Sequence, residues 1–199
     1  MQESHLVARI LFIAVVMSIA ACLQIFQASF IYWRPVFWEE GWRWWTAHWV
    51  HVGWIHYALN MVGLACLPFI FPFARIRFLL LLLFLLPPVL SFGFYYLYPS
   101  IDAYAGLSGI LHGMYMAMAL YFITVVEERR FAAVVLFLIL GKILWEQTFG
   151  SLQTAQLIGS PVLVEAHLLG SSSGLILALM YLAYRCVQLK FRQKGAEKQ

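Results

Sequence analysis

Four polar side chains in this 199-residue sequence are of types that can carry out acyl transfer. Ser108 follows Tyr-Ala-Gly-Leu and precedes a glycine, and His167 stands in the segment Ala-His-Leu-Leu-Gly. A serine hydroxyl is a weak nucleophile until a neighbouring imidazole accepts its proton. His56 and Asn60 are one helical turn apart, so they share a helix face from which both can donate hydrogen bonds to a developing oxyanion. These residue types predict serine-dependent acyl chemistry if the fold brings them together.

Each feature also has a structural interpretation when it is taken alone. Gly106 and Gly109 flank Ser108, and a Gly-x-Ser-Gly run in an apolar helix is usually a packing face that admits a close neighbour. The same glycines also allow a loop to turn directly into a helix beside a reactive serine. A single histidine in an apolar segment, such as His167, is more often a hydrogen-bonded structural group than a base. Only a common position for all four polar groups favours the catalytic interpretation.

The composition places the elements that hold these residues in a membrane. The sequence is 63% hydrophobic and 11% charged, with a mean hydropathy of +0.82, which is more apolar surface than a soluble domain can hide. Six apolar stretches approach the ~20 residues that a helix needs to cross a bilayer. We therefore expect an all-α membrane protein, a single domain over residues 1–199 with six transmembrane helices. The predicted spans are roughly 7–29, 55–73, 78–98, 107–126, 130–150 and 164–187.

Lys and Arg residues set the expected orientation of the bundle. Most of them lie at the amino end, in the second and fourth connections or in the tail, whereas only Arg34 and Arg43 lie in the opposite set of loops. Because cytoplasmic loops carry the excess of Lys and Arg, both termini are expected in the cytoplasm. The four polar groups then lie at the outer ends of their spans, at one depth and on three helices. The same bias accounts for the net charge of +4, so the expected surroundings are a lipid bilayer and no nucleic acid.

These segments, taken in order, resemble the motifs of the rhomboid family. The first loop reads Trp-Arg-Trp-Trp from Trp42, which is similar to the family's Trp-Arg loop motif, and His56 and Asn60 match its His-x-x-x-Asn at the start of the second span. Residues 106–109 resemble its Gly-x-Ser-Gly nucleophile motif, and residues 166–174 resemble its Ala-His-x-x-Gly-x-x-x-Gly motif in the sixth span. The resemblance covers most of the chain.

The resemblance implies an intramembrane serine protease with a catalytic dyad. Ser108 would be the nucleophile and His167 the general base, with no carboxylate as a third member. An oxyanion hole would be formed by the backbone N–H of Ser108 with the side chains of His56 and Asn60. The fifth span and the loop at about 151–162 would form the lateral gate and cap that admit a substrate helix. No metal and no cofactor are implied.

The family motif of the sixth span also carries an expectation about packing. Gly170 and Gly174 should hold this span tightly against the fourth span. Together with Gly106 and Gly109, these glycines are expected to support the active site without taking part in its chemistry.

One position departs from the common family pattern. Family members commonly carry an aromatic residue, often Tyr, four residues after the nucleophile, where it stacks on the catalytic histidine; here that residue is His112. The Gly-x-Ser-Gly-x-x-His-Gly form, in a short chain, resembles the rhombosortase branch of the family. His112 is then expected to support the His167 ring, although a ring one turn below Ser108 is also a rival base.

The resemblance to this branch gives the most specific functional prediction. Rhombosortases are thought to process secreted proteins that carry a C-terminal Gly-Gly signal, an apolar helix and a basic tail. The expected partner is therefore a membrane-anchored protein substrate with a C-terminal transmembrane helix, cleaved near the periplasmic face of a bacterial inner membrane.

Three other functions remain as alternatives. One is a general rhomboid protease that cuts other single-span membrane proteins. Another is a non-catalytic binder of membrane helices, against which the retention of Ser108 and His167 argues. A small transporter is the least consistent, because the polar cluster lies near one face of the membrane and not at the midplane between repeats.

Three further charged residues lie in or beside the spans. Lys142 and Glu146 are one turn apart in the fifth span and are expected to pair with each other, as a structural ion pair or as part of gating. Glu165, two residues before His167, lies near the active site or faces outer water. It is on a different helix face from His167, so we do not expect it to act as a triad acid.

Overall fold

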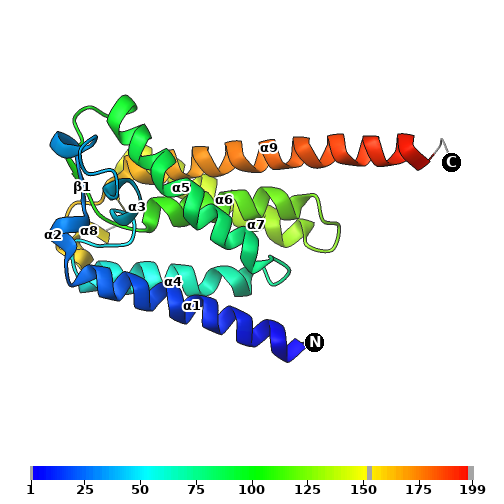
Figure 1. Ribbon diagram of the computed structural model, residues 1–199, viewed down its shortest axis with the longest axis horizontal. Coiled ribbons are helices and arrows are strands. Elements are labelled where there is room, and N and C mark those ends of the chain that lie inside the picture. The colour runs from blue at the N-terminus through cyan, green and yellow to red at the C-terminus, as the bar shows by residue number, and fades with distance from the viewer. Residues whose placement is uncertain (1, 152–153, 197–199) are drawn as a thin grey trace.

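The computed structural model describes residues 2–151 and 154–196 of the chain, and most of these residues are helical. Within these ranges the long helices are α1 (Gln2–Gln24), α4 (Trp54–Ile70), α5 (Ile76–Leu97), α6 (Ser108–Ile123), α7 (Arg129–Phe149) and α9 (Val164–Ala196) (Figure 1). By length and composition, α1, α5, α7 and α9 can each cross a membrane, while α4 and α6 are shorter apolar helices. The chain is therefore a multi-pass, all-α membrane protein, with two strands of two residues each in the described part.

Each predicted span coincides with one of these helices, and the differences lie at the ends. α1 ends at Gln24 instead of residue 29, because the buried Gln24 side chain exchanges two hydrogen bonds with the backbone of His51 and the chain then turns. α9 continues to Ala196 instead of 187, because its basic end is polar but still favourable for a helix. α1 begins and α9 ends toward the same end of the bundle, which fits an even number of crossings (Figure 1). The side of the membrane on which this end lies stays a prediction.

α6 is the enclosed helix of the bundle. Most of its residues are buried, and it packs against α4, α5, α7 and α9. A helix with neighbours on every side needs no polar face, which explains why α6 is apolar all round. Its 16 residues form a helix of about 24 Å, shorter than the ~30 Å hydrocarbon core of a bilayer. At least one end of α6 must therefore lie below the membrane surface, and Ser108 is the first residue of this short helix.

Glycines bring α6 and α9 into backbone contact. A Cβ atom at Gly170 would lie 1.9 Å from the carbonyl oxygen of Gly109, and one at Gly174 would lie 2.1 Å from the carbonyl oxygen of Gly113. Any side chain at Gly170 or Gly174 would push the two helices apart. The close packing of the sixth span on the fourth thus includes Gly113, for which the sequence had given no role.

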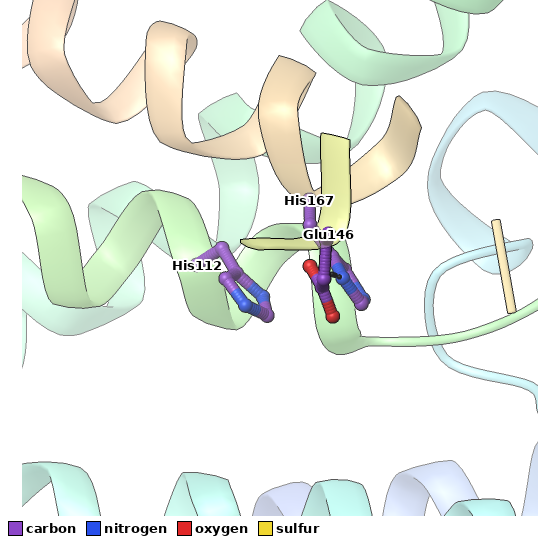
Figure 2. Close-up of side chains that lie close together, drawn as sticks. All are labelled: His112, Glu146 and His167. Atoms are coloured by element: carbon purple, nitrogen blue, oxygen red, sulfur yellow. Dashed lines mark hydrogen bonds and ion pairs between the residues drawn. The ribbon is translucent and has the colours of Figure 1, made fainter. Parts of the chain in front are cut away.

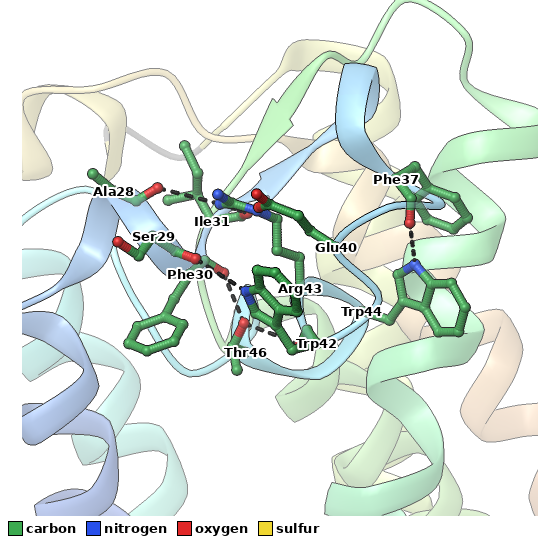
Figure 3. Close-up of polar contacts among 10 residues, drawn as sticks. All are labelled: Ala28, Ser29, Phe30, Ile31, Phe37, Glu40, Trp42, Arg43, Trp44 and Thr46. Atoms are coloured by element: carbon green, nitrogen blue, oxygen red, sulfur yellow. Dashed lines mark hydrogen bonds and ion pairs between the residues drawn. The ribbon is translucent and has the colours of Figure 1, made fainter.

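Two arginines hold the segment between α1 and α4 against backbone carbonyls. Arg34, at the start of η1 (Arg34–Val36), donates hydrogen bonds of 2.7–3.0 Å to four carbonyl oxygens at and just beyond the end of α5, those of Phe94, Tyr95, Tyr98 and Ile101. Arg43, at the start of α3 (Arg43–Thr46), donates to the carbonyls of Ala28 and Ile31 and forms an ion pair with Glu40 (Figure 3). Ala28 belongs to α2 (Gln27–Phe30), so Arg43 ties this short helix to α3. Both arginines therefore hold this segment in place through hydrogen bonds to backbone carbonyls.

α5 contains two prolines without ending at either of them. Pro88 has no N–H, so the carbonyl of Phe84, four residues earlier, loses its helical hydrogen bond. The indole N–H of Trp45, in α3, donates to this carbonyl at 3.0 Å. A neighbouring segment thus satisfies the freed group, which is the condition for tolerating proline inside a membrane helix.

A short pairing of strands links the first loop to the residues before Ser108. β1 (Tyr32–Trp33) pairs antiparallel with β2 (Ala103–Tyr104), with Tyr32 opposite Tyr104. Two residues after β2, the N–H of Gly106 donates to the carbonyl of Ala47 at 3.1 Å. The first loop therefore fixes the path of the chain into α6. The predicted cap at about 151–162 includes α8 (Thr154–Ile158), while its residues 152 and 153 lie outside the described part.

Candidate active site

The turn into α6 requires glycine at position 106. Gly106 has φ = +148°, a conformation that side chains rarely adopt. A Cβ atom there would also lie 2.8 Å from Cε1 of His56. The phenolic O–H of Tyr104 donates to the carbonyl of Gly106 at 2.7 Å and fixes the turn. Ser108 is thereby held at the helix start, where its backbone N–H has no intrahelical partner.

His167, near the start of α9, lies beside Ser108. Its Nε2 atom is 2.9 Å from Oγ of Ser108, although the two residues are 59 positions apart. His167 is buried, whereas Ser108 is half-buried. The backbone contact between Gly109 and Gly170 brings α9 close enough for this approach. The structure thus brings together the two residues that the sequence predicted as nucleophile and base.

A carboxylate contacts the other ring nitrogen of His167. Oε2 of Glu146, in the last turn of α7, lies 2.7 Å from Nδ1 of His167, and only 3% of Glu146 is exposed (Figure 2). The family resemblance implies a dyad without a carboxylate as a third member, but in this chain a carboxylate contacts the histidine. The predicted ion pair between Lys142 and Glu146 is confirmed, but it uses only Oε1. The second oxygen remains available for the imidazole.

The position of Glu146 along its span is a sequence signal for this contact, although the nearby Lys142 offers a simpler partner. The i, i+4 interval to Lys142 already supplies Glu146 with a partner, so this spacing alone does not indicate a second one. The contact to His167 spans 21 residues and two helices, which no local pattern reports. Depth does report it: Glu146 lies at the end of α7 that meets the starts of α6 and α9. An ionisable residue at the depth of the other polar groups belongs to their cluster.

The hydrogen bonds assign one tautomer to His167. An ionised Glu146 carboxylate can only accept, so the ring proton of His167 lies on Nδ1. Nε2 is then an acceptor, and the hydroxyl of Ser108 donates to it. A histidine in this state can take the serine proton, as a general base must.

His112 stacks on the His167 ring. The two ring centroids are 4.1 Å apart, and the planes are inclined by 17°. Nδ1 of His112 lies 2.7 Å from the carbonyl oxygen of Ser108, so this nitrogen carries the proton and donates. Within the described residues, no hydrogen bond joins His112 to the Ser108 hydroxyl. This geometry favours the supporting role expected for His112 over that of a rival base.

Ser108 faces a cavity of about 440 Å³ that is bounded by α4, α7 and α8. Apolar residues make up most of its walls, such as Leu59 on α4, Leu138 on α7 and Ile158 on α8. The polar residues that line it are His56, Asn60, Ser108, His112, Lys142, Glu146, Thr154 and His167. The cavity can therefore hold an apolar peptide segment against the reactive serine.

His56 and Asn60 reach this cavity from α4. An amide N–H of Asn60 donates to the carbonyl of His56 at 2.9 Å, which leaves its second N–H available. Nδ1 of His56 is buried and has no partner among the described residues. Both side chains share the cavity wall with Ser108, as the predicted oxyanion hole requires.

His112, Glu146 and His167 are also the group of described residues that could hold a metal ion, with ligand atoms within 4.8 Å of one another (Figure 2). The Lys142 ammonium, however, already contacts Glu146 and lies 3.5 Å from Nδ1 of His167. A second cation would be repelled there, and both nitrogens of His167 are already engaged. The arrangement is better suited to moving a proton than to binding a metal.

Two buried histidines of the first loop, His48 and His51, do not line the cavity. Nε2 of His48 donates to Oγ of Ser91, at 3.0 Å, because the Ser91 hydroxyl itself donates to the carbonyl of Trp44. Neither ring nitrogen of His51 has a partner among the described residues; Gln24 binds its backbone instead. Burial lowers the pKa of each histidine to about 3, so both are neutral near pH 7 and act as structural groups.

The fold and the site together define a multi-pass membrane protein with a Ser–His pair and a carboxylate clustered at one end of its helices. The family model of the Rhomboid domain matches residues 39–184, well over half of the chain. The chain therefore belongs to the rhomboid family. No curated protein matches the sequence at a significant level.

Proposed function

We propose that the chain is an intramembrane serine protease that cleaves a membrane-anchored protein near the periplasmic face of a bacterial inner membrane. The observation that carries the proposal is the 2.9 Å contact between Oγ of Ser108 and Nε2 of His167 beside a cavity of about 440 Å³. Membership of the rhomboid family supports it. The proposed periplasmic opening rests on the distribution of Lys and Arg between the loops.

In the proposed reaction, Oγ of Ser108 attacks the carbonyl carbon of the scissile peptide bond while Nε2 of His167 takes the serine proton. The oxyanion accepts hydrogen bonds from the backbone N–H of Ser108 and from the side chains of Asn60 and His56. His167 then returns the proton to the leaving nitrogen, and the C–N bond breaks. In the second half, His167 takes a proton from water, whose oxygen attacks the acyl carbon. His167 then returns the proton to Oγ of Ser108 as the ester C–O bond breaks, which releases the new C-terminus and restores the serine.

The substrate segment must be unwound when it reaches Ser108. A helical peptide buries its carbonyl oxygens in its own hydrogen bonds, so it offers no carbonyl for attack. The cavity between α4 and α7 is apolar along most of its length, which suits a segment that arrives from the membrane. Its polar groups gather at Ser108, where the unwound backbone would need partners.

The proposed substrate class is the C-terminal Gly-Gly sorting signal of secreted proteins, as in the rhombosortase branch. The support for this finer assignment is His112, at the position where the family commonly has an aromatic residue. Glycine also lowers the cost of unwinding a helix, by about 1 kcal/mol per residue relative to alanine. A Gly-Gly segment would therefore open easily and bring little bulk to Ser108.

The test uses two matched substrates with the purified chain in lipid vesicles. One carries a Gly-Gly segment, an apolar helix and a basic tail, and the other has Leu-Leu in place of Gly-Gly. We expect cleavage of the first alone, with a new C-terminus at or beside Gly-Gly by mass spectrometry. Equal cleavage of both indicates a general rhomboid protease, and binding of both without cleavage indicates a non-catalytic binder.

Ser108→Ala is the control for the nucleophile. Alanine fits a helix face of small residues, so the fold should persist while cleavage falls by several orders of magnitude. Cleavage near the wild-type rate in Ser108→Ala would exclude the proposed enzyme.

Two histidine variants decide which ring is the base. His167→Ala should be as inactive as Ser108→Ala, and the double variant should be no worse than either single variant, because the pair acts as a unit. His112→Tyr installs the residue common in the family and should keep appreciable activity. An inactive His112→Tyr beside an active His167→Ala would make His112 the base.

A further inference from the structure

Glu146 is a buried acidic group that the proposed reaction leaves without a role. Only 3% of it is exposed, in the last turn of the largely apolar helix α7. Burying a carboxylate in a membrane helix is costly, so its position calls for partners on both oxygens. Oε1 binds Lys142 and Oε2 binds His167. An ion pair with Lys142 alone would not require the second contact.

We propose that Glu146 is a positioning residue for His167, and that Lys142 holds its carboxylate in place. The inference rests on the proposed roles of Ser108 and His167. It adds a third member to a site in which the family resemblance implies two, and it divides the three members among α6, α9 and α7.

The geometry around the imidazole is that of a catalytic triad. Glu146 lies 2.7 Å from Nδ1 of His167, and Ser108 lies 2.9 Å from Nε2 on the other side of the ring. The carboxylate fixes the proton on Nδ1 and leaves Nε2 free to accept from serine. When His167 takes the serine proton, the ring becomes a cation and the adjacent carboxylate balances its charge. The proton stays on His167 and is not passed to Glu146.

The positive charge of Lys142 increases the need for a carboxylate beside His167 during catalysis. Its ammonium lies 3.5 Å from Nδ1 of His167, so it would repel the cation that forms on the ring during catalysis. The Glu146 carboxylate binds both groups and neutralises this repulsion. Lys142 in turn orients Oε1, and its own side chain is about one third exposed at the cavity. The cation is therefore tolerable beside the base only while Glu146 is charged.

This arrangement predicts unequal effects for the two partners of the ion pair. Glu146→Gln removes the negative charge and leaves Lys142 unpaired beside the ring. Its amide N–H can also donate to Nδ1 of His167, which would move the ring proton to Nε2 and leave no acceptor for the serine proton. Lys142→Gln leaves the carboxylate on Nδ1 intact. Removing Lys142 from the Glu146→Gln protein should therefore restore part of the lost activity. If the pair only stabilises α7, the two single variants should be equally harmful and the double variant should show no recovery.

The experiment measures how fast a fluorophosphonate probe labels Ser108 in the purified, reconstituted chain. The probe reports activation of the serine without a natural substrate. Glu146→Gln should slow labelling by ~10²- to 10⁴-fold and Lys142→Gln by less than about tenfold. The Glu146→Gln, Lys142→Gln double variant should be labelled roughly tenfold faster than Glu146→Gln. Glu165→Gln is the matched control, because Glu165 is a carboxylate two residues from His167 with no ion pair to a described residue, and its rate should be unchanged.

Cleavage of the membrane substrate provides a second readout. Loss of positioning should lower kcat and leave KM unchanged, whereas a distorted α7 wall should change KM as well. If Glu146→Gln does not fold, Glu146→Asp is the substitute, because it keeps the charge for Lys142 but shortens the reach to His167. We expect slower labelling of Glu146→Asp at unchanged thermal stability.

Each outcome bears on a distinct claim. Wild-type labelling rates in Glu146→Gln, or in Glu146→Asp where Gln does not fold, overturn the positioning role while the proposed protease stands. Equal losses in Glu146→Gln and Lys142→Gln without recovery in the double variant also overturn it, in favour of a structural ion pair. If the wild-type chain is neither labelled at Ser108 nor active on any substrate, the proposed function and this inference fall together.

Discussion

The two sides of α6 are built in opposite ways at the active-site end. Toward α9 the backbones touch, and Gly170 leaves no room for even one methyl group. Toward α4 and α7 there is a cavity of about 440 Å³ with mainly apolar walls. Ser108 and His167 are carried by the two tightly packed helices, α6 and α9, and their side chains line the cavity. The close helix contact that fixes the proposed dyad and the cavity proposed as the substrate entrance thus lie on different sides of α6.

Glu146 is the exception to this separation. It is carried by α7, a wall of the cavity, but it contacts His167 on the tight side. The outward-facing surface of α7 is largely exposed, as in Phe137 and Leu144. The tight side, where α6 contacts α9, and the open side, where the cavity faces α4 and α7, can therefore be tested separately.

The largest effect is expected from breaking the tight side. Gly170→Ala places a methyl group against the Gly109 carbonyl and should cost ~3 kcal/mol or more of stability and abolish cleavage. Gly141→Ala is the control, because Gly141 lies on α7 with open space around it and should gain up to ~1 kcal/mol. Thermal unfolding in detergent and cleavage assays measure both. If Gly170→Ala and Gly141→Ala had the same stability and the same cleavage rate, the α6–α9 contact would not be the tightly packed side of the bundle.

The next effect concerns a polar group on the open side. Asn60→Ala should lower kcat by ~10²-fold while KM changes little, because the amide acts on the oxyanion in the transition state. Asn60 also donates to the carbonyl of His56, so thermal stability must be measured in parallel. An unchanged kcat in a stable Asn60→Ala protein would remove Asn60 from the site.

Locking the open side should block entry without disabling the chemistry. Cysteines at Leu59 and Leu138, on opposite walls of the cavity, can be joined by a reducible cross-linker once Cys22, Cys66 and Cys186 are replaced. Cleavage of a membrane substrate should fall by more than about tenfold and recover on reduction. Labelling of Ser108 by a small fluorophosphonate should change much less. If cleavage survives the cross-link, the substrate enters elsewhere.

A separate effect, on stability alone and not on the reaction, is a loss of stability in acid. Burial holds the pKa of His48 and His51 at about 3, against 6.5 for the unfolded chain. Between these values the unfolded chain binds protons that the folded chain does not, so stability falls as the pH falls below 6.5. From pH 7 to pH 5 the loss should be about 2 kcal/mol per histidine.

His51→Phe isolates one of these two titrations. The ring of His51 has no hydrogen-bond partner among the described residues, so phenylalanine should be tolerated at pH 7. The loss of stability between pH 7 and pH 5, measured by thermal unfolding at the two pH values, should shrink by about 2 kcal/mol. An unchanged loss would mean that His51 does not titrate in this range.

The sequence was sufficient for the features that a single segment encodes. Runs of apolar residues located all six helices, because burial in lipid demands them. The charge distribution and helix starts brought Ser108, His167, His56 and Asn60 to one depth, and the structure places all four around one cavity. The finer claims, from the orientation of the termini to the substrate, stay predictions.

The features that the sequence did not predict depend on contacts between distant segments. The contact of Glu146 with His167 depends on how α7 is rotated against α9, and hydropathy does not encode this rotation. Arg34 was counted only as a loop charge, yet it binds four carbonyls at and beyond the end of α5. A backbone carbonyl gives no sequence signal of its own, so partners of this kind appear only once the fold is known.

The hydrogen bond from Trp45 to the Phe84 carbonyl holds α3 against α5. Pro88 prevents α5 from satisfying this carbonyl, and the neighbouring Phe84 side chain is 61% exposed, toward lipid. The hydrocarbon region contains no water that could replace the indole. Moving α3 away from α5 would therefore leave the Phe84 carbonyl without a hydrogen-bond donor, at a cost of several kcal/mol. A proline that removes one hydrogen bond from α5 thereby makes separation of α3 from α5 costly.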